Sequence, residues 1–275
     1  MRKKNIILTT AILLIAGCAN KEQQEAQALL QRATQAYQHQ EYSKAKLQLD
    51  SIRELYPKEF DTRKQAIRLH QRIELDETRI GLHYIDSSLT TARANIEPLT
   101  QGLKLDKNPR YEEIGHYYSP RHSTEKNVGR SYMRPQTSEK GTSSLIVFHH
   151  GKPIEAHTLR ISTNNDSYVE LKASEPAYAT SNAMGRTERV DFPTEGLDNA
   201  ANFLASLNGK SIKVTLVGNK GKATLPLSKA DSEILVQVSR LGSVIRTVKQ
   251  LEKQQDELKR QIEFISNRMS NDSVK

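Results

Sequence analysis

Apolar residues recur at alternating spacings of three and four in two long stretches of the chain. The first seam consists of Leu75, Thr78, Leu82, Ile85, Leu89, Ala92, Ile96, Leu99 and Leu103. The second consists of Leu241, Val244, Val248, Leu251, Gln255, Leu258, Ile262, Ile265 and Met269. This spacing is typical of helices that pair as a coiled coil. Pro98 predicts a break in the first helix near Ile96, because proline disrupts the turn that precedes it.

The two seams have similar lengths and flank a region of different character. We therefore expect the helix over residues 229–275 to pair antiparallel with residues 75–103, as an intramolecular coiled-coil stalk. The alternative is a parallel homodimer through the final helix alone. A monomer is favoured, because the first seam offers a partner within the same chain.

The chain before the first seam is rich in helix-forming residues from Glu22 onward. Residues 29–57 resemble one tetratricopeptide repeat. The matching positions are Leu29, Ala33, Ala36, Tyr42, Ala45, Leu49, Ile52 and Pro57. Repeats of this kind need about three copies to bury a continuous core. A structural helical hairpin is therefore favoured over a peptide-binding groove.

From Gly129 to Leu227 the pattern changes to short alternating runs separated by turn residues, which predicts strands. The strands are expected at 144–150, 158–162, 168–172, 186–192, 212–216 and 223–227, with a helix at 195–207 closed by Asn208-Gly209. Residues 104–128 have no period and predict a long loop. The fold class is therefore α+β, with an antiparallel β-sandwich or open barrel inserted between the stalk helices.

The domain boundaries follow from these patterns. A signal peptide is expected over residues 1–17, and a helical region with the hairpin and first stalk helix over 18–106. The β-rich domain spans 107–228, and the final helix spans 229–275.

The amino terminus has the pattern of a lipoprotein signal peptide. A basic stretch at residues 2–4 precedes an apolar run over 6–15, which is too short to span a bilayer. The run ends in Ile15-Ala16-Gly17-Cys18, an aliphatic residue and two small residues before the single cysteine. Cys18 is therefore the predicted lipid attachment site, and several acyl chains on it would anchor the chain stably to a membrane. Ala19 in place of an aspartate favours the outer membrane of the cell envelope.

Composition narrows the range of partners. The net charge is +9, and three of the positive charges lie at residues 2–4, which leaves +6 after cleavage. This mild excess is spread along helices without a basic stripe or interleaved aromatic residues, so nucleic acid is not an expected partner. The single cysteine excludes an internal disulfide.

No residue pattern indicates catalysis, a metal or a cofactor. Nucleophile-elbow, zinc-protease, phosphate-loop and dinucleotide motifs are all missing from the sequence. His149 and His150 are adjacent, but neighbours on a strand face opposite sides. A pocket around Tyr168, Tyr178 and Phe192 is the candidate site for a small ligand. A hydrolase would need one of the eight histidines beside a serine or carboxylate in one cleft.

The cysteine motif, the single hairpin and the stretches 126–132 and 209–216 together resemble envelope lipoproteins of Bacteroides-type bacteria. The resemblance covers most of the chain and implies a lipid-anchored protein without bringing an activity. The expected function is a non-enzymatic structural or protein-interaction component of the envelope, contacting another envelope protein or a glycan. The alternative is a small-ligand or glycan-binding module in the β-rich domain.

Overall fold

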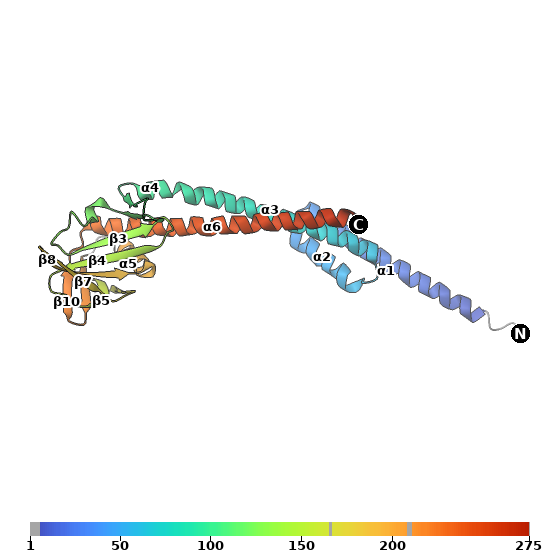
Figure 1. The fold of residues 1–275 in the computed structure, drawn as a ribbon. Coiled ribbons are helices and arrows are strands. Elements are labelled where there is room, and N and C mark those ends of the chain that lie inside the picture. Colours follow the sequence, from blue (N-terminus) through green and yellow to red (C-terminus); the bar gives the residue numbers. More distant parts are fainter. Residues whose placement is uncertain (1–5, 165–166, 208–210, 275) are drawn as a thin grey trace. The chain divides into compact units, whose positions relative to one another are not determined.

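The computed structural model describes the backbone of residues 6–164, 167–207 and 211–274, and side chains within those ranges from residue 21 to residue 272. It divides into two compact units. The helical unit comprises the residues up to Ser87 and those from Lys253 onward, and the β-rich unit comprises Ser88–Glu252. Figure 1 labels the helices and several of the strands. The helices are α1 (Ile6–Gln38), α2 (Tyr42–Leu55), α3 (Phe60–Ala94), α4 (Ile96–Thr100), α5 (Thr194–Ser206) and α6 (Lys229–Val274).

The helical hairpin predicted near the amino terminus is present as α1 and α2. Ala33 and Ala45 are fully buried, which lets the two helices approach closely, and Ile52 is buried with them. The chain reverses at Gln40, whose φ of 58° lies in the left-handed region. The hairpin packs on α3 in one apolar cluster. Helix α1 begins at Ile6 rather than near Glu22, so its backbone runs without a break through residue 18.

The antiparallel pairing of α3 and α6 is confirmed in both units. In the helical unit, the Gln71 side-chain amide donates to Asp272 Oδ2 over 2.8 Å. Farther along the same pair, the amide of Gln255 donates to Asp86 Oδ1 over 2.6 Å. Between these two contacts the residue numbers rise along α3 and fall along α6, so the two helices are antiparallel. The single polar residue of the second seam, Gln255, is thus satisfied by a carboxylate across the seam.

The same helix pair continues in the β-rich unit until α3 ends. Leu89 packs against Val248 in a small apolar cluster. Helix α3 ends at Ala94 and the short α4 follows with Pro98 inside it, as the sequence predicted. Ala94 stands four residues before Pro98, where the proline ring would clash with the helical carbonyl.

The inserted region forms two open antiparallel sheets, which confirms the predicted class. The six-stranded sheet has the order β1 (Lys104–Asp106), β2 (His116–Tyr118), β3 (Tyr132–Ser138), β4 (Ser143–His150), β8 (Gly185–Phe192) and β7 (Tyr178–Asn182). The four-stranded sheet has the order β10 (Gly221–Leu225), β9 (Ile212–Gly218), β5 (Ala156–Thr163) and β6 (Tyr168–Lys172).

The long loop predicted over residues 104–128 is wrong in part. This segment holds β1, β2 and a 3-10 turn over Pro120–His122. Strands β3 and β7 also escaped prediction. Pro135 argues against an interior strand because it lacks an N–H donor. It is tolerated in β3 because β2 pairs only with residues 136–138 and stops short of it.

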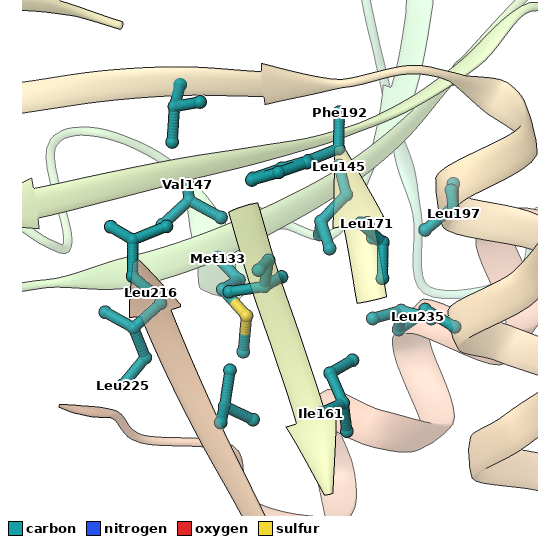
Figure 2. Packing of buried hydrophobic residues seen from close by; sticks show 14 of the residues in the cluster. Met133, Leu145, Val147, Ile161, Leu171, Phe192, Leu197, Leu216, Leu225 and Leu235 are labelled. Carbon is teal, nitrogen blue, oxygen red and sulfur yellow. The ribbon is translucent and has the colours of Figure 1, made fainter. Parts of the chain in front are cut away.

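The main core lies between the two sheets and two helices. Figure 2 shows Met133 and Val147 from the six-stranded sheet facing Ile161 and Leu216 from the four-stranded sheet. Leu197 of α5 and Leu235 of α6 close the same cluster. Helix α5 agrees with its prediction to one residue at each end, while its predicted Asn208-Gly209 stop lies outside the described residues. The full buried set also includes Leu145, Leu159, Leu171, Val190, Phe192, Val214 and Val238.

Candidate functional site

The predicted lipid attachment site is covered by the structure only as backbone. Cys18 belongs to α1, and its side chain lies outside the described residues. In the part of the chain that the structure describes, no helix is long and apolar enough to cross a membrane. Lipidation of Cys18 therefore rests on the sequence motif alone.

The three residues predicted to share a ligand pocket lie in three different settings. Phe192 is fully buried in the main core, as Figure 2 shows. Tyr168 is 56% exposed on β6, with the Arg160 guanidinium 4.7 Å from the centre of its ring. Tyr178 is 55% exposed on β7, in the other sheet. The structure therefore does not bring these three side chains together.

Tyr178 instead belongs to a row of rings and guanidinium groups across the outer face of the six-stranded sheet. This arginine–aromatic face consists of Tyr118, Tyr132, Arg134, Phe148, Tyr178 and Arg189. Each member lies on the face opposite the core, because side chains alternate along a strand and Leu145 and Val147 point inward. The sequence showed these residues individually, but their alignment depends on strand register.

Two kinds of contact connect the residues of this face, namely one stacked pair of rings and several arginine–ring contacts. Tyr132 stacks on Phe148 with their ring centres 4.6 Å apart. The Arg134 guanidinium lies 5.3 Å from the Tyr118 ring centre and 5.4 Å from that of Phe148. Arg189 lies 6.0 Å from the Phe148 ring centre and 6.0 Å from that of Tyr178. These distances are within the range of cation–π attraction.

The two arginines differ in how they are neutralised. Arg189 makes a two-pronged ion pair with Asp191, at 2.8 Å and 2.6 Å, and this hydrogen bonding raises the pKa of Arg189. Among the described residues, no carboxylate lies within salt-bridge distance of Arg134, and its Nε is buried without a hydrogen-bond acceptor. Arg134 therefore lies between two rings without a direct salt bridge, and Glu125 is a carboxylate close enough to interact with its charge.

Such a face can bind a ligand without covalent chemistry. An aromatic ring offers flat apolar surface, and a guanidinium offers donors to hydroxyl or carboxylate oxygens. The exposed part of the face lies around Tyr178, whereas Tyr118 and Tyr132 are buried. Burial also raises the pKa of the Tyr132 phenol.

The histidine pair highlighted in the sequence stands apart on β4. His150 Nδ1 lies 3.3 Å from Thr187 Oγ1, and His149 Nδ1 lies 3.5 Å from Ser131 Oγ. Across the described residues, no group of three or more His, Cys, Asp or Glu side chains could hold a metal ion.

Among the described residues, the histidine that is buried beside a carboxylate is His122. Its Nε2 lies 2.9 Å from Asp231 Oδ1, while Ser228 Oγ donates to Asp231 Oδ2 over 2.5 Å. The carboxylate thus stands between the histidine and the serine, so His122 does not hydrogen-bond to the serine it would have to deprotonate. The 109-residue separation of His122 and Asp231 left no local signal in the sequence.

The Asp231 carboxylate has a lowered pKa. Burial alone would raise this pKa, but hydrogen bonds from Ser228 and His122 lower it by more than burial raises it. Ser228 Oγ in turn accepts from the Asp231 backbone N–H, which completes a capping box at the start of α6. The cluster therefore fixes the turn at residues 120–122 to the first turn of α6.

Comparison of the chain with protein-family models, with curated proteins and with solved structures finds no match.

Proposed function

We propose that this protein is a lipid-anchored, non-enzymatic component of a bacterial cell envelope, tethered through Cys18. The observation that carries the proposal is the Ile15-Ala16-Gly17-Cys18 motif after a basic stretch and a short apolar run. The outer membrane is the proposed location, because Ala19 rather than an aspartate follows the cysteine.

The partner is proposed to be another envelope protein, contacted through the β-rich unit. A monomer is proposed because the seam of α6 already packs against α3 of the same chain. Sedimentation at low concentration would test this, since a dimer would require α6 to leave α3.

The anchoring proposal is tested by replacing the cysteine. The full chain is expressed in a bacterium fed an alkyne analogue of palmitate, beside Cys18→Ala and the neighbouring control Asn20→Ala. Wild type and Asn20→Ala are expected in the membrane fraction with the label attached. Cys18→Ala is expected to lose the label, because it has no thiol to acylate. Equal labelling of all three chains, or none, would contradict the proposal.

A glycan-binding role is the second candidate, and the arginine–aromatic face favours it. Sugar rings present flat CH-rich surfaces that suit exposed tyrosines, and acidic sugars suit Arg134, which makes no salt bridge among the described residues. This role concerns the β-rich unit alone and is independent of the anchor.

The chain contains a matched pair of tyrosines for testing this role. Tyr178 and Tyr168 are equally exposed, and each lies against an arginine, but only Tyr178 belongs to the arginine–aromatic face. On an array of acidic and neutral glycans, Tyr178→Ala is expected to weaken binding about 2–5-fold, from the loss of about 0.5–1 kcal/mol at an exposed ring. Tyr168→Ala is expected to bind as wild type. Equal losses in the two variants would reject the face as the site.

A further inference from the structure

An apolar groove lies in the β-rich unit, bordered by α4, α5, β9 and the first turns of α6. Its volume is about 710 Å³, within the range of ligand pockets. Its apolar lining consists of Pro98, Leu99, Leu204, Ala205, Leu207, Ile212, Leu227 and Val236. Most of these side chains are only partly covered by the protein. We refer to it as the α6 groove.

A second hollow continues the α6 groove along the same helix. It measures about 360 Å³ and shares Pro98, Leu99 and Arg240 with the first. It adds Val244 one turn farther along α6. The two together make an open groove along α6, and Arg240 lines both parts of it.

The polar groups on the rim are mostly satisfied within the protein. The Gln237 amide donates to the carbonyl oxygens of Leu99 and Gln101, over 3.0 Å and 2.9 Å. Ser232 Oγ donates to the Ser228 carbonyl over 3.1 Å. Lys229 lies 3.9 Å from Glu233. The groove therefore offers few donors to a ligand rich in polar groups.

Arg240 is the exception on this rim. Among the described residues, no carboxylate lies within salt-bridge distance of it and no carbonyl accepts from it. A ligand that complements the groove must therefore supply an apolar body and one anionic group near the middle. A peptide would bring amide groups that find no partners here, and each unpaired buried amide is unfavourable. A sugar would leave the apolar lining facing hydroxyl groups.

We propose that the α6 groove binds a long-chain fatty acid. Its carboxylate accepts hydrogen bonds from Arg240, and its hydrocarbon chain lies along Leu204, Leu207 and Ile212. Two parallel N–H donors of a guanidinium match the two oxygens of a carboxylate. The proposal rests on the β-rich unit and does not depend on the lipid at Cys18.

Two variants and their controls test the groove with the full chain held in amphipol, and the signal of amphipol alone is subtracted because its alkyl chains also take up a fatty-acid probe. The probe is cis-parinaric acid, whose fluorescence rises in an apolar site, with palmitate as the competitor. Ala205→Trp fills the groove from its exposed rim on α5. Asn199→Trp places the same ring at an exposed position of α5 that does not line the groove. Saturable binding is expected for wild type and Asn199→Trp, and its loss is expected for Ala205→Trp.

The carboxylate is tested separately, at an exposed residue whose replacement leaves the core intact. Arg240→Gln is expected to weaken palmitate binding about tenfold or more, because it removes a charge-assisted hydrogen bond. Arg240→Lys is expected to restore most of that loss, and the methyl ester of palmitate is expected to bind equally to wild type and Arg240→Gln. No saturable binding by wild type, unchanged binding by Ala205→Trp, or an equal effect of Arg240→Gln on acid and ester would each overturn the proposal. Displacement of the probe by an amphipathic peptide but not by palmitate would also overturn it.

Discussion

The helical unit and the β-rich unit are stabilised by different kinds of contact. In the helical unit, side chains meet at regular intervals along two helices, and the polar seam residue Gln255 finds a partner across the seam in Asp86. In the β-rich unit, the core joins residues far apart in the sequence, such as Met133, Leu216 and Leu235. A substitution in a periodic seam affects mainly the neighbouring contacts along the two helices. A substitution in a core assembled from two sheets and two helices disturbs the close packing of all four elements.

Polar contacts show the same difference. Arg246 of α6 donates to the Gly141 carbonyl over 2.7 Å and to Asp198 Oδ2 over 2.6 Å. Ser239 Oγ donates to the other oxygen of Asp198 over 2.7 Å. One carboxylate and one guanidinium thus connect α6, α5 and the turn between β3 and β4. In the helical unit, by contrast, the ion pair of Lys46 and Glu77 connects only α2 and α3.

The largest effect is expected from a cavity in the core of the β-rich unit. Phe192 is fully buried, so Phe192→Ala is expected to lower the free energy of unfolding by about 3–5 kcal/mol. Phe264 of the helical unit is 67% exposed, and Phe264→Ala is expected to change it by no more than about 0.5 kcal/mol. Urea denaturation measures both, and hydrogen exchange assigns the loss to a unit. A comparable loss in the two variants would refute the difference.

The same difference explains how far the sequence predicted the fold. The α3–α6 pair was predictable because each seam residue is three or four positions from the next, so the pattern is local. Strands β2 and β3 were not, because their evidence is pairing across the sheet, as between Tyr118 and Gln136. Pro135 also disfavoured a strand at β3 in the sequence, and only the pairing with neighbouring strands shows that a strand forms there.

The candidate sites divide in the same way. The cysteine motif at residues 15–18 is contiguous and was visible at once. The arginine–aromatic face depends on register, since Arg189 meets Phe148 only because β8 pairs with β4 at that position. Phe192 was misplaced in a pocket because alternation shows that a side chain faces one side of a sheet without showing which side is covered.

The next largest effect is expected at two helical glycines, one in each unit. At Gly242, a methyl group would collide with Ser143 Oγ and lie 2.7 Å from Thr137 Oγ1, where α6 approaches the hairpin of β3 and β4. Gly242→Ala is therefore expected to destabilise the protein by about 1–3 kcal/mol. At Gly81, the nearest atom to a new methyl group is Leu258 Cδ1 at 3.8 Å, an ordinary contact. Gly81→Ala is expected to stabilise by up to about 1 kcal/mol, because alanine favours helix.

The same glycine-to-alanine substitution is expected to change stability in opposite directions at the two positions. The pair of variants therefore separates the effect of packing from the effect of helix propensity. Thermal melting and urea denaturation of the two variants provide the measurement. If Gly242→Ala were neutral, the close approach of α6 to the sheet would be disproved. If Gly81→Ala destabilised the protein, the α3–α6 seam would be tighter than the structure shows.

The smallest effect is expected at the start of α6, where Asp231 connects this helix to His122 within the β-rich unit. Burial raises the pKa of this carboxyl, but hydrogen bonds from Ser228 and His122 bring it below its ordinary value in the folded protein. The ionised form is thus bound more tightly in the folded state, and its stabilising contribution is present above the unfolded pKa of about 3.9. That contribution is lost as the pH falls through the lower folded pKa.

Asp231→Asn is expected to destabilise by about 0.5–2 kcal/mol at pH 7, typical of a lost helix cap, and the difference from wild type should shrink below about pH 4. Asp256, an exposed carboxylate on α6 in the helical unit, is the matched control, and Asp256→Asn is expected to leave the melting temperature unchanged at both pH values. A difference between wild type and Asp231→Asn that stayed constant from pH 7 to pH 3 would show that the shape of the side chain, and not its charge, holds the cap.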